Sequence, residues 1–288
     1  MEHFYIITNE TKDPDFEITY RIRDYLLKCG KKCSIREQVR EKRGKIYTDS
    51  NMLKEDVDCV LVLGGDGTLL QAAADLADLS VPFLGINLGT LGFLAEVNKD
   101  DMEEAFSKLL AGEYEIENRM MLYGCCYRPG EDGEMDNARA LNDIVITRKG
   151  SLQIITFAIS VNGQFLHRYS ADGIIVATPT GSTGYNLSAG GPVVDPKAQL
   201  MVATPICPHS MQHRSIVLSP EDEITILIET GHDGSRQEVE AIFDGSHRVT
   251  LRTGDRIVIR RSDKTTGIVK LNRVSFLEIL NRKMLDGK

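Results

Sequence analysis

The chain has 288 residues, of which 42% are hydrophobic and 26% charged, a composition typical of a globular protein with one large domain or two ordinary ones. Its formal net charge of −8 disfavours binding to nucleic acid by charge alone. No apolar run reaches membrane-spanning length, and the N-terminal residues, MEHFYIITNE, lack the basic and apolar regions of a signal peptide. Six cysteines without zinc-type pairs are typical of reduced thiols. We therefore expect a cytoplasmic protein that binds neither nucleic acid nor membrane.

Strand and helix patterns alternate over the first 118 residues. Short apolar runs predict strands at 3–8, 32–35, 58–63 and 81–87. Apolar residues at helical spacing predict helices at 18–29, 69–79 and 101–110. This alternation is typical of a parallel sheet covered by helices, so we expect an α/β domain over residues 1–118.

Beyond residue 118 the pattern changes to short β candidates, and the chain ends in a helical pattern at 276–284. The Asn162-Gly163 pair between two of the β candidates is a strong hairpin signal. We expect a mostly antiparallel all-β domain over residues 119–274, with two packed sheets. Strands are predicted at 122–127, 140–147, 154–161, 164–169, 173–177, 215–218, 223–229, 238–243, 247–251 and 255–260.

The most informative motif is GGDGT at 64–68, which lies between a predicted buried strand and a predicted helix. The exposed N–H groups of such a turn favour an anion. No Gly-Lys-Ser/Thr follows, so the motif is not a Walker A loop. The carboxylate of Asp66 would repel a phosphate unless it binds a cation or accepts a proton from an attacking hydroxyl. A tight turn capped by Asp66 explains the motif equally well.

A second candidate segment, TPTGSTGYNLSAGGPVV at 178–194, is rich in glycine and small hydroxyl residues. Its apolar flanks predict a loop held by the core, which favours a functional role over a flexible surface linker. Asn142 and Asp143 at the start of one predicted strand, and Asp172 just before another, suit ribose hydroxyls and base edges. Turn capping would explain each of them taken singly. The FDGS sequence at 243–246 predicts a hairpin turn.

Taken in this order, the motifs resemble those of the ATP–NAD kinase family, and the resemblance covers nearly the whole chain. GGDGT alone is shared with diacylglycerol kinase, sphingosine kinase and phosphofructokinase relatives, whereas the block at 178–192 is highly specific. The motifs are GGDGT at 64–68, GIN at 85–87 with LGFL at 91–94, Asn142-Asp143, Asp172-Gly173, the block at 178–192 and Asp244-Gly245.

The resemblance implies an α/β N-terminal domain with a Rossmann-like parallel sheet, an all-β C-terminal sandwich, and a last helix at 275–288 that returns to the first domain. It implies transfer of the γ-phosphate of ATP to the 2′-hydroxyl of the adenosine ribose of NAD, giving NADP. Because the motifs lack a P-loop lysine, we expect Mg²⁺ that arrives bound to ATP, with no direct protein ligands. The resemblance also implies a homo-oligomer, most simply a tetramer, with sites built across subunits.

The matching positions suggest individual roles. Asp66 would accept the proton and Gly67 would contact the nucleotide, while Asn142 and Asp143 would hold adenosine groups. Asp172 would come from a neighbouring subunit. The adenine and ribose pocket would be lined by Thr183, Gly184, Tyr185, Asn186, Leu187 and Ser188.

Three further NAD-binding positions depart from common members of the family: Gln153, Ser170 and Ser246. They bear on the preference for NAD or NADH and for ATP or polyphosphate. Two alternatives remain open. A lipid or sugar kinase with the same GGDGT motif would need a different acceptor site, and a lipid kinase an apolar groove. A decayed dinucleotide-binding sensor would have lost the base, yet Asp66 is present.

Overall fold

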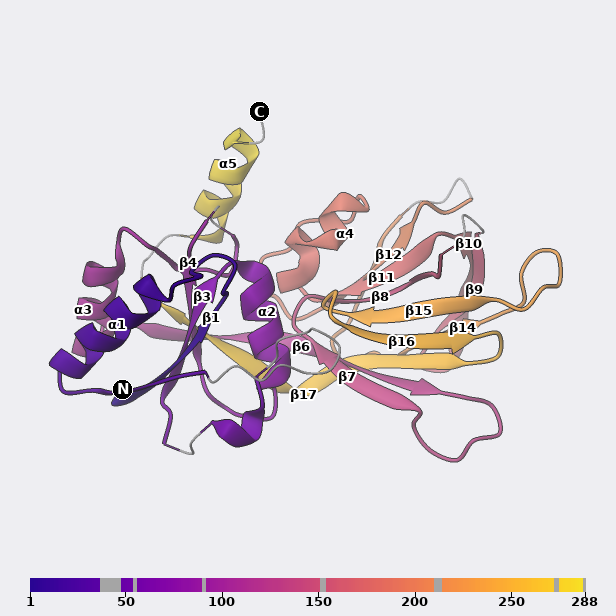
Figure 1. Ribbon diagram of the computed structural model, residues 1–288. Helices are drawn as coiled ribbons and strands as arrows, with labels where there is room; N and C mark the ends of the chain where they lie inside the picture. The colour runs from indigo at the N-terminus through magenta and orange to yellow at the C-terminus, as the bar shows by residue number, and fades with distance from the viewer. Residues whose placement is uncertain are drawn as a thin grey trace. The chain divides into compact units, whose positions relative to one another are not determined.

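The structure is a computed structural model that describes residues 1–36, 48–53, 56–89, 92–150, 154–209, 214–271 and 275–286. The chain forms two compact units. Unit 1 comprises Met1–Arg119 and Thr265–Lys288, and unit 2 comprises Met120–Lys264. The first is α/β and the second is almost entirely β (Figure 1). Residues 265–271, which were predicted as part of the β domain, instead belong to unit 1.

Unit 1 contains a parallel sheet in the order β4-β3-β1-β2, with a short β5 beside β4. Nearly every residue of β1, β3 and β4 is buried, because helices cover both faces of the sheet. The end of the long strand β17 pairs with β4, in parallel. The strands are β1 (His3–Thr8), β2 (Lys32–Ile35), β3 (Cys59–Gly64), β4 (Phe83–Asn87) and β5 (Val97–Asn98).

Helices α1 (Glu17–Lys28) and α3 (Met102–Ala111) share one core cluster with the sheet and cover the same face. Helix α2 (Asp66–Asp75) lies on the other face, where Leu69 packs against Gly85 of β4. A short 3₁₀ turn, η1 (Ser50–Met52), precedes β3. The prediction for α2 was wrong at its start, since the helix begins at Asp66 rather than at residue 69. Its first turn lies beyond the sheet edge and carries no apolar pattern, so hydrophobic spacing does not reveal it.

The last helix, α5 (Phe276–Asp286), belongs to unit 1 and is drawn in yellow in Figure 1. Its Phe276 ring lies 6.2 Å from the ring of Phe93, and the Lys283 Nζ lies 5.0 Å from the centre of that ring. These contacts place α5 beside the GFL segment that follows β4.

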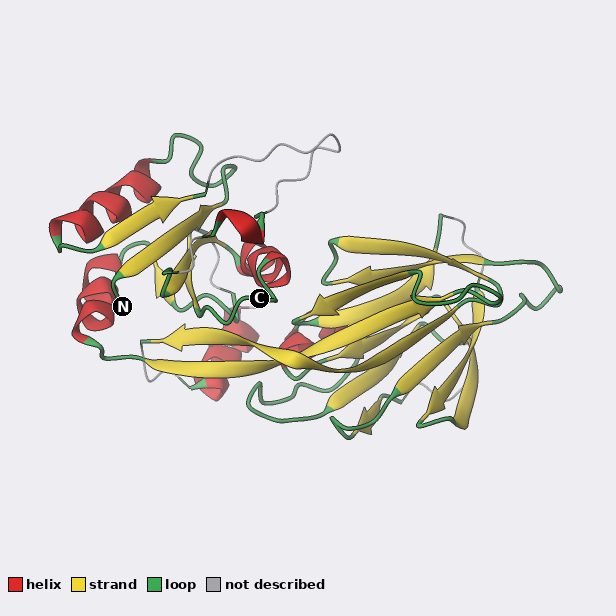
Figure 2. Ribbon diagram, turned by 90° about the horizontal axis from the view of Figure 1, so that it is seen from below, coloured by secondary structure: helices red, strands yellow, loops and turns green. Residues whose placement is uncertain are grey.

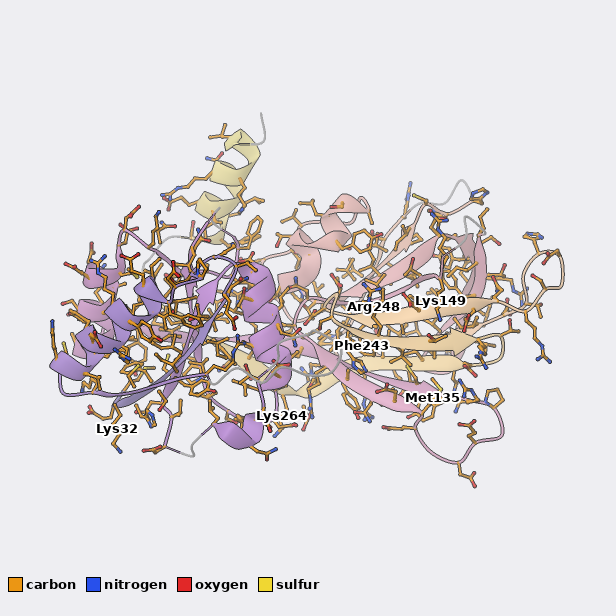
Figure 3. The ribbon with its side chains drawn as sticks, viewed as in Figure 1. Lys32, Met135, Lys149, Phe243, Arg248 and Lys264 are labelled. Atoms are coloured by element: carbon orange, nitrogen blue, oxygen red, sulfur yellow. The ribbon has the colours of Figure 1, made fainter. Side chains whose placement is uncertain are left out.

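Unit 2 contains two sheets that enclose one hydrophobic core (Figure 2). Phe157 and Ile226 from one sheet and Phe243 from the other belong to the same buried cluster; Phe243 is labelled in Figure 3. One sheet has the order β13-β12-β11-β8-β15-β16, with β13 (Ile216–Leu218), β12 (Met201–Ile206), β11 (Gly173–Ala177), β8 (Asp143–Arg148), β15 (Glu238–Phe243) and β16 (His247–Arg252). The other contains β10 (Gln164–Ala171), β9 (Ile155–Val161), β14 (Ile224–Ile228), β17 (Arg256–Lys270), β6 (Glu115–Tyr127) and β7 (Asp136–Ala140). The start of β6 and the end of β17 belong to unit 1, and through β17 these strands continue the sheet of that unit.

Four strands differ most from the predictions: β6 begins at Glu115 rather than at residue 122, β17 ends at Lys270 rather than at residue 260, and the other two are β8 and β12. The run at 140–147 is interrupted at Leu141 and Asn142, which separate β7 from β8. Strand β12 was not predicted, since Pro205 within it argues against a central strand. Pro205 pairs with Ile174 of β11 and lies beyond the part of β12 that pairs with β13, which is Met201–Ala203.

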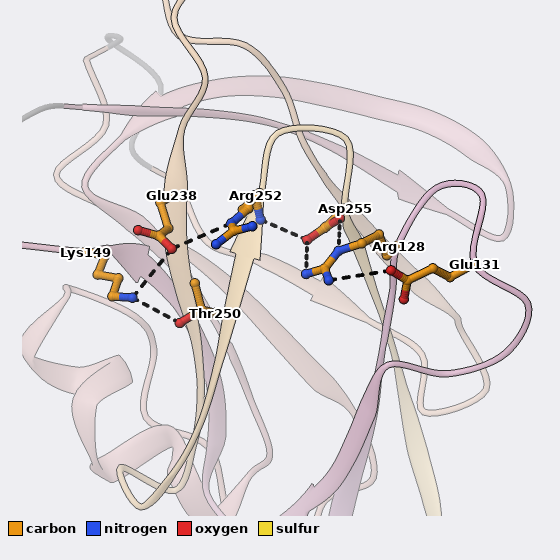
Figure 4. A network of polar contacts seen from close by, with 7 residues as sticks. All are labelled: Arg128, Glu131, Lys149, Glu238, Thr250, Arg252 and Asp255. Atoms are coloured by element: carbon orange, nitrogen blue, oxygen red, sulfur yellow. Dashed lines mark hydrogen bonds and ion pairs between the residues drawn. The ribbon is translucent and has the colours of Figure 1, made fainter.

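Turns and ion pairs hold the hairpins of unit 2. Asn162-Gly163 joins β9 to β10 with φ of 51° and 76°, as the sequence predicted, and Asp244-Gly245 joins β15 to β16 in the same left-handed conformation. Figure 4 shows the polar network around the β16–β17 turn. There the buried Asp255 accepts hydrogen bonds from the Arg252 N–H at 2.9 Å and from the Arg128 guanidinium at 3.4 Å.

Candidate functional site

The Asp66 side chain in unit 1 is held in one orientation by the turn that follows β4. Its Oδ2 accepts the N–H of Phe93 at 2.7 Å, and its Oδ1 accepts the N–H of Leu94 at 3.2 Å. A β-carbon placed on Gly92 would lie only 1.8 Å from Asp66 Oδ1. The carboxylate therefore occupies the space that any other side chain at position 92 would need. Thr90 and Leu91 of the same motif lie outside the described residues.

The rest of the GGDGT turn is also shaped by close contacts. A β-carbon on Gly64 would lie 2.3 Å from Thr68 Oγ1, which accepts a hydrogen bond from Asn9 Nδ2 at 3.1 Å. Gly67 is exposed, with open space where a side chain would be. Because parallel strands end at the same edge of the sheet, residues that follow β1, β3 and β4 meet here. At this edge the fixed carboxylate of Asp66 lies next to the exposed backbone of Gly67.

Unit 2 holds Asn142 and Asp143 at the start of β8 through a distant carboxylate. Asp244, in the β15–β16 turn, accepts the N–H groups of Leu141 at 2.6 Å, Asn142 at 2.8 Å and Asp143 at 3.1 Å. The turn that contains Asp244 also contains Ser246, which is partly buried. The structure thus brings together Asn142, Asp143 and the FDGS turn, which lie about a hundred residues apart in the chain.

The carboxyl group of Asp143 is unusual because it is buried and its pKa is raised. It is 6% exposed, and burial, followed by the charge of Asp244, raises its pKa to about 7. Burial also raises the pKa of Asp244 to about 6, although its three N–H donors oppose that rise. Next to this pair, Asn142 Oδ1 is buried and accepts no hydrogen bond from the described residues. A buried polar atom without a partner is uncommon in proteins, and a ligand donor would satisfy it.

The segment at 178–194 packs directly on Asn142 and Asp143 and is not a flexible linker. It forms a 3₁₀ turn, η2 (Thr180–Thr183), followed by one helical turn, α4 (Tyr185–Ser188). A β-carbon on Gly181 would lie 2.1 Å from the carbonyl oxygen of Asn142. One on Gly184 would lie 3.3 Å from Asn142 Nδ2 and 3.8 Å from Asp143 Oδ2. Glycine at these positions lets the segment approach the amide and the carboxyl group closely.

The predicted pocket residues at 183–188 do not all face outward. Tyr185 and Leu187 are 47% and 44% exposed, and Ser188 is also exposed. Asn186 is fully buried: its amide donates to the carbonyl oxygens of Ser182 and Pro192, and its Oδ1 accepts from Thr204. The Asn186 side chain therefore fixes the shape of the segment and is not available at its surface.

Two family models match the chain. The ATP-NAD kinase N-terminal domain matches residues 4–114, and the ATP-NAD kinase C-terminal domain matches residues 141–271. A protein named NAD kinase from Lachnospira eligens is 45% identical over 296 residues, covering 99% of this chain and 100% of that protein. Another, from Lachnoclostridium phytofermentans, is 43% identical and covers 99% and 100%. This chain belongs to the ATP–NAD kinase family.

Solved structures of NAD and NADH kinases show the same fold. An NAD kinase from Archaeoglobus fulgidus in complex with ATP has a TM-score of 0.75 at 26% identity, covering 97% of this chain and 98% of that one. Yeast NADH kinase in complex with NADH has a TM-score of 0.80 at 23% identity, covering 99% and 87%. At that identity the second similarity concerns the fold alone.

Within this ATP–NAD kinase chain, Asp172 lies apart from Asn142 and Asp143. Strands β8 and β11 are antiparallel, and Asp143 pairs with Ala177 at the end of β11, whereas Asp172 precedes its first residue. Five residues of strand separate the two carboxyl groups by roughly 17 Å. Asp172 Oδ1 instead lies 3.3 Å from Arg148 Nε. A single chain therefore does not place Asp172 beside the Asn142–Asp143 pair.

A cavity of about 700 Å³ opens near this end of the sheet, and a second of about 500 Å³ adjoins it. Ser170 and His232 line both. Gln153 lies outside the described residues. The cationic and imidazole side chains of the larger cavity come from separate turns, so no local motif in the sequence connects them: Arg148, Lys149, His209, His232 and Arg236.

The described residues contain no group of three or more His, Cys, Asp or Glu side chains able to hold a metal ion. In the same residues, no helix is both long and apolar enough to cross a membrane.

Proposed function

We propose that this protein transfers the γ-phosphate of ATP to the 2′-hydroxyl of the adenosine ribose of NAD, giving NADP. The observation that carries the proposal is the fixed carboxylate of Asp66 in the GGDGT turn, in a chain that belongs to the ATP–NAD kinase family. The fold similarity to a kinase solved with ATP supports ATP as the phosphate donor.

Asp66 acts as the proton acceptor. A ribose hydroxyl is a weak nucleophile at neutral pH, and a positioned base assists it as the bond to phosphorus forms. Two backbone N–H groups fix the direction of the Asp66 carboxylate, so no reorientation is needed when the hydroxyl arrives. The neighbouring Gly67, exposed and without a side chain, leaves room for the nucleotide.

Unit 2 supplies the adenosine contacts. The unpartnered Asn142 Oδ1 accepts a donor from the adenosine, and Asp143 binds a second group beside it. The exposed ring of Tyr185 offers a flat face for the base. Asn186 holds this segment in shape from the interior. The remaining contacts that we propose come from Thr183, Gly184, Leu187, Ser188 and Ser246.

Mg²⁺ enters as part of the substrate MgATP, bound by the phosphates. Bound to ATP, Mg²⁺ supplies neutralisation of the charge on the transferred phosphate.

The direct test is NADP formation from purified protein, MgATP and NAD, read with an NADP-specific dehydrogenase. Asp66→Asn keeps the size of the side chain and removes the base, so kcat should fall by about a hundredfold to ten-thousandfold while NAD affinity changes little. Glu113→Gln, an exposed carboxylate in the same unit, is the control and should be as active as the parent. Phosphorylation of a diacylglycerol or a sugar, with none of NAD, would contradict the proposal.

The active form is a homo-oligomer, most simply a tetramer, in which Asp172 of one subunit completes the NAD site of another. Ser170 and Gln153 are further NAD-binding residues in this proposal. The support is the distance of roughly 17 Å along β11 between Asp172 and the Asn142–Asp143 pair within one chain. Mixing and reassembling an Asp66→Asn chain with an Asp172→Ala chain should restore part of the activity, because some hybrid sites have both carboxylates. Absence of rescue in a hybrid shown to have formed, or a fully active monomer by light scattering, would refute shared sites.

A further inference from the structure

The proposed phosphoryl-transfer site needs positive charge from the protein as well as from the metal. The γ-phosphate carries negative charge next to the Asp66 carboxylate, and transfer depends on alignment and on neutralisation of that charge. The GGDGT motif contains no lysine or arginine, unlike a P-loop. A cation at this edge of the sheet must therefore come from another segment of the chain.

Lys12, in the segment that follows β1, reaches this edge. Its Nζ lies 3.1 Å from the place that a β-carbon on Gly65 would occupy and 3.2 Å from the corresponding place on Gly89. Gly65 belongs to the turn after β3 and Gly89 to the turn after β4. One ammonium group thus lies against the backbone of both glycine turns, and a side chain at either glycine would require it to shift by a few tenths of an ångström.

The surrounding bonds hold these three segments in register. Asn9, three residues before Lys12, donates to Thr68 Oγ1 in the GGDGT motif at 3.1 Å. The backbone N–H of Lys12 itself donates to the carbonyl oxygen of Asn9 at 3.0 Å. On the other side, Asn87 holds the Gly89 turn, donating to the Gly89 carbonyl at 2.5 Å and accepting its N–H at 3.1 Å. These bonds fix the backbone from which the Lys12 side chain extends.

A structural role for the Lys12 charge would require a carboxylate partner. None of the described residues forms an ion pair or a side-chain hydrogen bond with Lys12, although the residue is exposed and could extend into solvent. The Lys12 ammonium lies over two glycine turns and has no carboxylate partner among the described residues. It is therefore suited to bind a phosphate, which a lysine binds as a compact point charge.

We propose that Lys12 binds the phosphate chain of the phosphoryl donor and holds it beside Asp66. This inference rests on the proposed function, since it concerns the donor half of the same site. It assigns to the segment after β1 a part in the reaction that none of the sequence motifs indicated.

The test compares Lys12→Ala, Lys12→Arg and the parent by calorimetric titration with MgATP and with inorganic tripolyphosphate, and by steady-state kinetics. Lys12→Ala should weaken binding of both ligands by about 10- to 100-fold, the range expected for loss of a hydrogen bond to a charged group. It should lower kcat/KM for ATP by a similar factor and leave NAD affinity within twofold. Lys12→Arg should recover most of the loss, since the charge is restored.

Lys28→Ala is the matched control. Lys28 is an exposed lysine in the last turn of α1, at the opposite edge of the same sheet, so its loss changes the net charge equally. ATP and tripolyphosphate affinities within twofold of the parent in Lys12→Ala, or equal losses in Lys12→Ala and Lys28→Ala, would overturn the proposal. So would a parent protein that binds neither ligand. A parent that binds ATP but forms no NADP would refute the proposed function, while the binding comparison would still decide the role of Lys12.

Discussion

Gly92→Ala should disable the protein through the Asp66 carboxylate, although position 92 need not contact a substrate. A β-carbon at position 92 would lie 1.8 Å from Asp66 Oδ1, 2.2 Å from its Cγ and 2.3 Å from its Oδ2. Real β-carbons essentially never approach another heavy atom closer than 3.0 Å, so the carboxylate and the turn must separate by more than 1 Å. A displacement of about 1 Å at a reacting group costs on the order of a hundredfold in rate.

The assay is kcat at saturating NAD and MgATP, with NADP read by a coupled dehydrogenase. We expect kcat to fall by about a hundredfold, with ATP and NAD affinities and the melting temperature close to those of the parent. Gly267→Ala is the control, because it adds the same methyl group in unit 1 beside the half-exposed Ile116 side chain at 3.1 Å, which can move. This control should retain nearly full activity.

A double-mutant cycle shows whether the effect passes through Asp66. In the Asp66→Asn background the base is already lost, so adding Gly92→Ala should lower kcat by only a small further factor. If the two fold-losses in kcat multiply in full in the double variant, the effect of Gly92→Ala does not pass through Asp66. A kcat of Gly92→Ala within threefold of the parent would also refute this explanation of why residue 92 is glycine.

Two further predictions concern unit 2. Because the pKa of Asp143 is raised to about 7, the folded state holds a proton that the unfolded state releases. The free energy of unfolding should therefore fall as pH rises from about 4 to about 7. Asp143→Asn should make this dependence on pH, measured by urea unfolding, less steep. Equal slopes for the variant and the parent would show that Asp143 ionises freely. Asn186→Ala removes the buried amide that donates to the carbonyl oxygens of Ser182 and Pro192 and accepts from Thr204, and it should lower the free energy of unfolding by about 3 kcal/mol. The exposed neighbour Ser188→Ala should lower it by less than about 0.5 kcal/mol. A similar small loss in both variants would contradict the supporting role given to Asn186.

Much of the fold could be predicted from local patterns. Strands β1 and β2 begin and end at the predicted residues, because each is a short apolar or alternating run bounded by a polar or glycine-containing segment. The Asn162-Gly163 hairpin also follows from local chemistry, since both residues adopt positive φ. Local patterns failed for β12, which contains a proline, and for the start of α2, where Asp66, Gly67 and Thr68 are not buried.

For the candidate site, the sequence determined the residue types: a carboxylate in a glycine-rich turn, an Asn-Asp pair at a strand start and a segment of small residues. Each of these, taken alone, was also explained by turn capping or a linker; the order of the motifs and their resemblance to the ATP–NAD kinase family indicated a nucleotide kinase. The tertiary structure alone decided which side chains meet. Asp244 holds residues 141–143 from a hundred residues away, Asp172 lies at the far end of β11, Asn186 faces inward, and Lys12 lies over two glycine turns. These arrangements depend on strand order and register, which are set by packing between distant segments and leave no periodic signal in the sequence.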